Sequence, residues 1–432
     1  MGANEENTCA AWSLARQLVQ IDSSDPGAYE GVIGQWLKEW IRRQAEKWNI
    51  PVKEEYSRLE EEKGDSSQSS SSEPSGGVYD RCLELKMEEV LPGRCNLMAR
   101  ISGTFPGPGL IFICHMDTVT LGEGWDENRP PLGAVVEGKR MYGRGACDMK
   151  SGLACALTAF SSVLRRIGET GRWPGRSITL IGSVDEEDFM RGVEKAIKSG
   201  WVSTQDWILD TEPTDGQIQV AHKGRTWFEL TIEGATAHAS TPWKGADAVA
   251  AMSEAVCHIR RSISRCPVHH ELGRSTVTFG QIEGGYRPYV VPDSCKVWID
   301  MRLTPPTDTE KAKGIVEEAI RVAGDQVPGT RGSYVITGDR PYIERDDKSA
   351  LLKALKQACR KATGEEAAVG FFNGYTDTAV IAGKLENHNC MSYGPGNLEM
   401  AHKPNEYVDY EDVDRCQRVL EILALETAFG EA

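Results

Sequence analysis

The sequence predicts an α/β protein in which a mostly parallel sheet is flanked by helices, with a smaller α+β domain inserted into it. Short β-branched runs alternate with helical patterns over the first half of the chain and again near its end, which is typical of a parallel sheet covered on both faces. Between these parts, apolar and polar residues alternate, as in an antiparallel sheet with one wet face. The length of 432 residues favours two domains over one.

The elements of the parallel sheet can be placed in order. Apolar residues at helical spacing predict helices at about 8–21 and 29–48, and a strand follows at 51–56. Residues 60–78 are acidic and then serine-rich, so we expect a disordered insertion there. Further strands are expected at 96–101, 110–114, 177–184 and 207–209, with helices at 151–167 and after 191.

The inserted domain is assigned to residues 222–338, and residues 1–221 and 339–432 form the two parts of the first domain. Alternating runs at 225–233, 275–282 and 295–303 predict its strands, and helical patterns at 246–263 and 309–323 predict its helices. The α/β pattern returns at about Tyr342, with helices expected at 348–362, 377–384 and 410–429.

Composition and charge exclude several function classes. A net charge of −15 disfavours nucleic-acid and anionic-membrane surfaces, since both need a basic patch. No apolar run approaches the length of a membrane span, and the polar, acidic start has no signal-peptide pattern. The 12 cysteines form no CxxC pair. We therefore expect a soluble cytoplasmic protein with reduced thiols.

The stretch SVDEED, residues 183–188, places four acids directly after a predicted buried strand. Carboxylates at such a position repel one another and lose hydration, so they cost stability unless a cation lies beside them or they extend into water. An acidic run is by itself most often a solvated loop, and other strand ends must decide between these interpretations.

Metal-ligating residue types follow the other predicted strands as well. They are His115 and Asp117 after 110–114, Asp148 after 141–146, Glu186 and Glu187 after 177–184, Asp210 and Glu212 after 207–209, and His402 near the C-terminus. Ligands collect at the carboxyl ends of strands in an open parallel sheet. Two histidines with several carboxylates form the donor set of a hard-to-borderline divalent metal. The sequence therefore predicts a metal centre at this edge of the sheet.

A pair of divalent cations explains the acidic run. Two such ions stabilise anionic ligands and lower the pKa of a bridging water, which a carboxylate that is not a ligand can deprotonate. Glu186 and Glu187 suit these two tasks because successive side chains diverge. Asp117 lies on the same side as His115 and can accept the ring N–H, which orients the ligand.

The chain resembles a family of hydrolases with two metal ions that includes acetylornithine deacetylase, succinyl-diaminopimelate desuccinylase, aminoacylases and glutamate carboxypeptidase. The resemblance covers nearly the whole chain outside the serine-rich insertion. The matching stretches are CHMDTV, MYGRGACDMKSG, SVDEED, LDTEPTDG, GATAHASTPWKGADAV, VVPD, DMRLTP and GPGNLEMAHKPNEYV.

The resemblance implies a role for each site residue. It implies that His115, Asp148 and Glu212 hold one metal ion, that Glu187, Asp148 and His402 hold the other, and that Glu186 is the general acid/base. It also implies two ions, zinc first, with manganese or cobalt as alternatives. His238 in the inserted domain would stabilise the oxyanion after closure or from a dimer partner, and Arg302 would receive a substrate carboxylate. The inserted domain is the usual dimerisation surface of such proteins, so a homodimer is expected.

Some residues depart from the family's pattern. Cys114 and Cys147 adjoin metal ligands, where we interpret them as small apolar fillers rather than ligands. Tyr289 stands where an asparagine contact to the substrate carboxylate is usual. The segment FFNGYTD, residues 371–377, replaces a glycine-rich run; Asn373 is a candidate substrate contact, and the phenylalanines are either binding surface or core. Asp210 is an alternative ligand to Glu212, and the match over the EPT stretch favours Glu212.

Together these expectations predict a hydrolase that cleaves an amide bond next to a carboxylate, in a small anionic N-acyl amino acid or peptide. The changes at Tyr289 and at 371–377 motivate an alternative, namely hydrolytic deamination or amidine/carbamoyl hydrolysis at the same two metal ions. A non-catalytic metal-stabilised binding protein is a further alternative, which the retained Glu186 and ligands disfavour.

Overall fold

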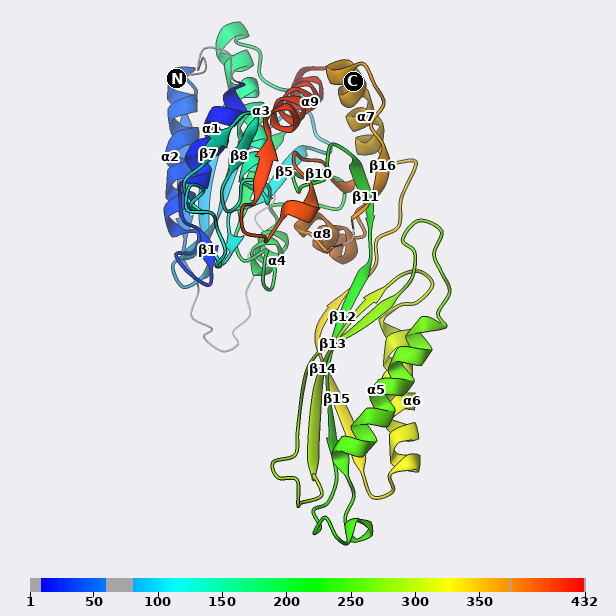
Figure 1. Cartoon of the computed structure of the whole chain (residues 1–432). Coiled ribbons are helices and arrows are strands. Elements are labelled where there is room, and N and C mark those ends of the chain that lie inside the picture. Colours follow the sequence, from blue (N-terminus) through cyan, green and yellow to red (C-terminus); the bar gives the residue numbers. More distant parts are fainter. Residues whose placement is uncertain (1–8, 60–80, 373, 431–432) are drawn as a thin grey trace. The chain divides into compact units, whose positions relative to one another are not determined.

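The computed structural model describes residues 9–59, 81–372 and 374–430. It divides into two compact units, a larger one of residues 1–220, 346–370 and 376–432 and a smaller one of residues 221–345 and 371–375 (Figure 1). The larger unit is α/β and the smaller unit is α+β, which confirms the predicted fold class. The insertion expected at 60–78 lies outside the described residues.

A nine-stranded sheet forms the centre of the larger unit, with the strand order β16-β11-β17-β10-β5-β9-β4-β3-β2. Its central strands β17, β10, β5 and β9 pair in parallel, whereas β3–β4, β4–β9 and β11–β17 are antiparallel. The strands are β2 (Val52–Ser57), β3 (Leu83–Leu91), β4 (Arg94–Ile101), β5 (Leu110–His115), β9 (Ile178–Ser183), β10 (Trp207–Asp210), β11 (Ile218–His222), β16 (Val369–Phe372) and β17 (Cys390–Ser392).

Helices cover both faces of this sheet. They are α1 (Ala10–Val19), α2 (Gly31–Lys47), α3 (Lys150–Thr170), α4 (Arg191–Lys198), α7 (Ala350–Thr363), α8 (Asp377–Leu385) and α9 (Tyr410–Phe429). Helices α1, α2 and α9 pack around α3, which contacts β5 and β9, while α4 and α8 contact strands and each other. Small residues near the start of α3 permit close approach: a Cβ added to Gly152 would lie 2.1 Å from the carbonyl oxygen of Thr211.

Smaller sheets complete the larger unit. Strands β7 (Val135–Glu137), β8 (Arg140–Tyr142) and β18 (Tyr407–Asp409) form a three-stranded antiparallel sheet, and β1 (Ser24–Asp25) pairs with β6 (Thr118–Val119). Because β18 pairs with β8, the segment after His402 is brought beside the segment before Asp148. A short helix, η3 (Leu398–Met400), precedes His402.

The smaller unit is a four-stranded antiparallel sheet, in the order β13-β14-β12-β15, with two helices on one face. The elements are β12 (Gly224–Glu233), η2 (Pro242–Lys244), α5 (Ala248–Ser264), β13 (Thr276–Gly284), β14 (Ser294–Leu303), α6 (Thr309–Gln326) and β15 (Arg331–Arg340). The alternation expected along β12 and β14 is present, with Phe228, Leu230 and Val297 buried toward the helices. Asp247 and Asp308 cap the two helices by accepting backbone N–H bonds.

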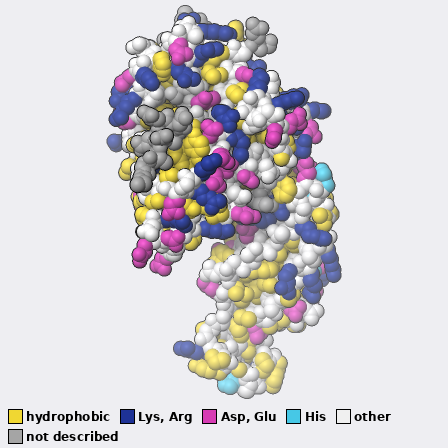
Figure 2. Space-filling model, turned by 45° about the horizontal axis from the view of Figure 1, so that its top comes forward, with side chains coloured by type: hydrophobic (Ala, Val, Ile, Leu, Met, Phe, Trp, Pro, Cys, Tyr) yellow, Lys and Arg dark blue, Asp and Glu magenta, His cyan; other side chains and the backbone are white. Residues whose placement is uncertain are grey.

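The surface matches the composition. Acidic and basic side chains are interspersed on the face of the larger unit in Figure 2. Within the described ranges, none of the helices is long and apolar enough to cross a membrane. All twelve cysteines are free thiols.

Candidate metal centre

The predicted ligands meet at the carboxyl edge of the parallel strands in the larger unit. His115 is the last residue of β5, Glu186 and Glu187 follow β9, and Glu212 follows β10. Asp148 lies just before α3, and His402 lies between η3 and β18. Parallel strands that end together place their following loops side by side, which is why residues so distant in sequence converge here.

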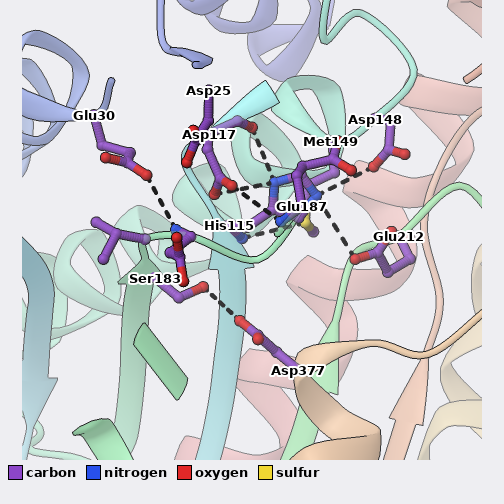
Figure 3. A network of polar contacts seen from close by, with 12 residues as sticks. Asp25, Glu30, His115, Asp117, Asp148, Met149, Ser183, Glu187, Glu212 and Asp377 are labelled. Atoms are coloured by element: carbon purple, nitrogen blue, oxygen red, sulfur yellow. Dashed lines mark hydrogen bonds and ion pairs between the residues drawn. The ribbon is translucent and has the colours of Figure 1, made fainter. Parts of the chain in front are cut away.

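Asp148 faces both histidines, and its contact with His115 is drawn in Figure 3. Its Oδ1 is 3.2 Å from Nε2 of His115, and its Oδ2 is 3.4 Å from Nε2 of His402. Glu212 Oε1 lies 3.7 Å from the same nitrogen of His115, and Glu187 Oε2 lies 3.0 Å from that of His402. Asp148 therefore presents one oxygen to the pair of His115 and Glu212 and the other oxygen to the pair of His402 and Glu187. A carboxylate placed in this way has the arrangement of a bridging ligand.

The residues fit divalent cations. Donor atoms of His115, Asp148 and Glu187, and likewise those of His115, Glu186 and Glu212, lie within 4.8 Å of one another. Imidazole nitrogens mixed with carboxylate oxygens suit zinc, manganese or cobalt. Burial raises the pKa of Glu212, and the nearby Asp148 and Glu186 raise it further, so ionised carboxylates are costly here without a cation.

The histidines carry much of the compensating charge in the metal-free protein. Burial alone would lower the pKa of His115, but Asp148, Glu212 and Glu186 raise it well above its ordinary value. The carboxylates of Asp148 and Glu187 raise the pKa of His402 to about 10. Burial opposes ionisation of Asp148, yet the two histidines hold its pKa below the usual range. Metal ions would displace the protons from both rings.

Asp117 orients the His115 ring through its backbone carbonyl oxygen, whereas its carboxylate was expected from the sequence to accept the ring N–H. The Nδ1 atom of His115 lies 3.0 Å from the carbonyl oxygen of Asp117 and 3.7 Å from its carboxylate, so the ring N–H meets the backbone oxygen. The Asp117 carboxylate instead accepts the backbone N–H of Glu187 at 3.1 Å. Burial, with Glu30 and Glu187 nearby, raises the pKa of Asp117 to about 7.

Glu186 and Glu187 diverge as expected. Glu187 faces His402, whereas Glu186 groups with His115 and Glu212. Within residues 9–59, 81–372 and 374–430, no hydrogen bond or ion pair reaches the Glu186 carboxylate. Burial raises its pKa well above the ordinary value, and Asp377 and Glu187 add to this effect. A buried carboxylate that holds a proton readily is suited to proton transfer.

The remaining acids of the SVDEED run differ in their surroundings. Asp185 is buried and accepts hydrogen bonds from the Arg191 guanidinium at 2.6 and 2.5 Å. Asp188 is exposed, and partial desolvation with Asp185 nearby raises its pKa. The acidic run is therefore not simply a solvated loop, because two of its negative charges have cationic partners nearby. Arg191 binds Asp185, and Glu187 faces His402.

Asp210 and the two cysteines lie outside the ligand groups. Asp210 Oδ2 accepts the Thr378 hydroxyl at 2.7 Å, and this carboxylate is in none of the metal-binding groups found among the described residues. Cys114 Sγ lies 3.3 Å from the Thr211 hydroxyl, and Cys147 Sγ lies 3.2 Å from the Asn397 carbonyl oxygen. Burial raises the pKa of Cys114 to about 12, so this thiol stays protonated.

The other candidate residues belong to the smaller unit. His238 and Tyr289 are exposed on adjacent segments, which are joined by the bridge between His238 and Val290. Arg302, on β14, donates to Asp300 at 3.0 to 3.2 Å. Phe372 is buried against the His222 ring, with centroids 5.9 Å apart, which favours core packing for this side chain. Asn373 lies outside the described residues.

Sequence reasoning missed several buried charged residues around the centre. Arg144 and Glu406 form an ion pair at 2.6 Å, Arg94 and Glu30 form another, and Asp377 accepts the Ser183 hydroxyl at 2.6 Å. The only sequence signal was that Arg144 and Glu406 lie within matched stretches, GRGACD and HKPNEY.

Comparisons with known proteins identify relatives of this chain. The sequence profile described as Peptidase family M20/M25/M40 matches residues 111–426. A probable succinyl-diaminopimelate desuccinylase of Staphylococcus aureus is 26% identical over 77% of this chain and 86% of its own length. An acetylornithine deacetylase of Aliivibrio salmonicida is 25% identical over 81% of this chain and 89% of its own length.

Solved structures share the fold across nearly the whole chain. Aminopeptidase PepT of Bacillus cereus superposes with a TM-score of 0.70 at 19% identity, covering 97% of this chain and 98% of its own. A dinuclear metal-binding peptidase of Bacillus subtilis, assigned to the M20 family, superposes with a TM-score of 0.63 at 16% identity, covering 98% of both chains. The chain belongs to Peptidase family M20/M25/M40 and is a metal-dependent hydrolase of C–N bonds.

Proposed function

We propose that this protein uses two divalent metal ions to hydrolyse an amide bond next to a carboxylate, in an N-acyl amino acid or a small peptide. The observation that carries the proposal is the placement of Asp148, whose two oxygens face two histidines that each have a further carboxylate beside them. Such an arrangement serves two cations sharing one carboxylate.

The metal ligands follow from these contacts. His115, Asp148 and Glu212 would hold one ion, and His402, Asp148 and Glu187 the other. When bound, two such ions polarise a carbonyl group and lower the pKa of a water molecule. Zinc is the first candidate because of the nitrogen ligands, and manganese and cobalt suit the same donor set.

Glu186 is the proposed general acid/base. Its carboxylate points into the ligand group yet is not needed to complete either ligand set. It takes a proton from the attacking water and returns one to the leaving amine. The raised pKa of Glu186, caused first by burial, favours this second task because it makes the protonated form easier to reach.

The substrate class rests on relatives and on the smaller unit. Two relatives are named as a desuccinylase and a deacetylase, and these names describe action on acylated amino acids. PepT is named an aminopeptidase. A substrate carboxylate would be received by Arg302, with Tyr289 and Asn373 as further contacts. Since Asp300 already holds the Arg302 guanidinium, that carboxylate must share or displace this partner.

The smaller unit would act as a lid and as a dimer surface. His238 is exposed, with Nδ1 2.8 Å from the Ser240 hydroxyl, and is available to stabilise an oxyanion on closure or in a partner subunit. Ile282 and Val335 are 57% and 55% exposed on β13 and β15, the two edges of its sheet, which supports pairing between copies. The twelve free cysteines support a cytoplasmic enzyme, because thiols stay reduced in that compartment.

The first test combines metal content with a substrate panel. Elemental analysis should find about two ions per chain, and hydrolysis of N-acyl amino acids or short peptides should stop on chelation and return with added metal. Ammonia release in place of amide cleavage would favour the deaminase or amidine-hydrolase alternative. Bound metal without turnover on any of these substrates would favour a binding protein instead.

A further inference from the structure

Two buried arginine–glutamate pairs lie directly beneath the loops that carry the ligands. Arg94 on β4 donates to Glu30 at 2.7 and 2.5 Å, and Arg144 donates to Glu406 at 2.6 Å. All four side chains are buried, with exposures of 10% and 0% for the first pair and 3% and 1% for the second. None of the four is among the proposed metal ligands.

The first pair holds the loop of Glu186 and Glu187. Glu30 Oε1 accepts the backbone N–H of Asp185 at 3.0 Å, and Arg94 lies 3.6 Å from the Asp185 carboxylate (the Glu30 contact is drawn in Figure 3). Asp185 has a φ of 67°, a left-handed conformation that residues other than glycine adopt at a cost. The pair therefore stabilises a turn that the loop would not adopt by itself.

The second pair holds the loops of Asp148 and His402 together. Glu406 Oε1 accepts the backbone N–H groups of Cys147 and Asp148 at 2.8 and 3.1 Å. Arg144, through its other N–H groups, donates to the carbonyl oxygens of Lys403 at 3.4 Å and His402 at 3.5 Å. His402 also has a left-handed φ, of 64°. This pair thus connects the bridging carboxylate to the histidine it faces.

We propose that Arg94–Glu30 and Arg144–Glu406 are positioning residues that set the ligand loops before metal binds, each pair acting on a different part of the centre. Arg94–Glu30 acts on Glu187, a ligand of one ion, and on Glu186. Arg144–Glu406 acts on Asp148, which faces both ions. The inference rests on the proposed function for its metal assignments, but the loop contacts exist in the metal-free protein.

Glutamine variants isolate the positioning role. Glu406 accepts from Arg144 on Oε2 and from backbone N–H groups on Oε1. Glu30 accepts from Arg94 Nε on Oε2, and its Oε1 accepts both from Arg94 Nη2 and from the Asp185 N–H. An amide NH₂ is only a donor, so Glu406→Gln must lose one of its two sets of bonds, and Glu30→Gln must lose either the Arg94 Nε bond or both bonds on Oε1, while each side chain keeps its shape. Asp206→Asn is a matched control: Asp206 is buried and accepts the N–H groups of Gly109 and Ser203, both at 2.9 Å, at the amino ends of β5 and β10.

The measurement is cobalt(II) affinity of the full-length protein, by chelator competition and visible absorption. Loss of such a supporting contact costs roughly 10–100-fold in metal affinity. Glu30→Gln should lower the affinity for one of the two ions by this factor and leave the affinity for the other near the wild-type value. Glu406→Gln should lower the affinity for both ions. Asp206→Asn should lower Tm and leave both affinities unchanged. Affinities of both glutamine variants that equal those of Asp206→Asn would overturn the proposal.

A second readout does not depend on metal. Amide hydrogen exchange of the chelated protein should be faster around residues 185–187 in Glu30→Gln and around 147–148 in Glu406→Gln, each without an effect on the other loop. Should either glutamine variant fail to fold, Arg94→Lys and Arg144→Lys can replace it. Lysine keeps the positive charge but lacks the planar, multiple N–H donors of the guanidinium, so the same loop-specific increase in exchange is expected. Wild type that binds no cobalt would refute the metal centre of the proposed function, and the exchange pattern would still decide on positioning.

Discussion

Replacing Glu186 with glutamine separates proton transfer from metal binding. The change preserves the volume of the side chain and removes its ability to take and return a proton. General acid–base catalysis contributes about 10²–10⁴-fold, so kcat should fall by that factor, or by about 3–5 kcal/mol of transition-state stabilisation. Metal content should stay near wild type, because the two proposed ligand sets do not include Glu186.

The same variant should be more stable than wild type in its metal-free form. Burial, followed by Asp377 and Glu187, raises the pKa of Glu186, so the folded state disfavours its ionised form. A raised carboxyl pKa contributes stability that is present below the ordinary value and is lost as pH rises through the folded one. At pH 8 Glu186→Gln removes this cost, and Tm in chelator should rise; at pH 4 the difference should vanish.

The assay is steady-state hydrolysis on the best substrate of the panel, with elemental analysis of the same samples. A kcat within tenfold of wild type would refute the role of Glu186 as general base. Loss of metal in parallel with activity would instead make Glu186 a ligand. A variant that is inactive, fully metallated and more stable in chelator would support the role of Glu186 in proton transfer.

Three further predictions follow from the titratable groups. Metal binding at pH 8 should release a proton from His402, because Asp148 and Glu187 raise its pKa to about 10 in the metal-free protein, and the raised pKa of His115 favours release from that ring as well. Calorimetry in buffers of different ionisation enthalpy measures this, and no buffer dependence would contradict it. Cys114→Ala should retain activity, and Cys114 should resist alkylation in the folded protein, because burial raises its pKa to about 12; rapid labelling would show that the thiol is accessible. Burial lowers the pKa of His222 to about 4, so its stabilising contribution is present above pH 6.5 and is lost as pH falls toward 4. His222→Phe should therefore remove up to about 3 kcal/mol of the acid-induced loss in the free energy of unfolding. Denaturant titrations measure this, and an unchanged pH profile would count against it.

Local patterns were sufficient for the long helices and for some of the long strands, but not for β3 and β15. The helices α3 and α9 and the alternating strands β12 and β14 were predicted within a few residues of their observed bounds, because periodicity over ten or more residues is a strong signal. Strand β15 was missed: its sequence RGSYVITGDR is interrupted by glycines and charged residues, and it is held mainly by pairing with β12. Short strands such as β16, β17 and β18 were missed because three or four residues carry too little periodicity to be recognised.

The sequence by itself determined which residues could meet at the centre. Ligand types after several predicted strands, in one parallel sheet, have to lie at one edge, because parallel strands end on the same side. His115, Glu187 and Glu212 do lie at or just after strand ends, as this rule predicts. The same rule explains why acids follow a buried strand, since they can serve a metal centre there.

Only the tertiary structure decided how the centre is held. The Asp185 N–H and its acceptor Glu30 are 155 positions apart, and Arg144 and Glu406 are 262 apart, so no local pattern could pair them. The turn of Asp148 toward two histidines likewise depends on contacts made across loops. Residue types and periodicity are properties of the sequence, but partners for buried charges are set by packing, because burial is what makes each partner necessary.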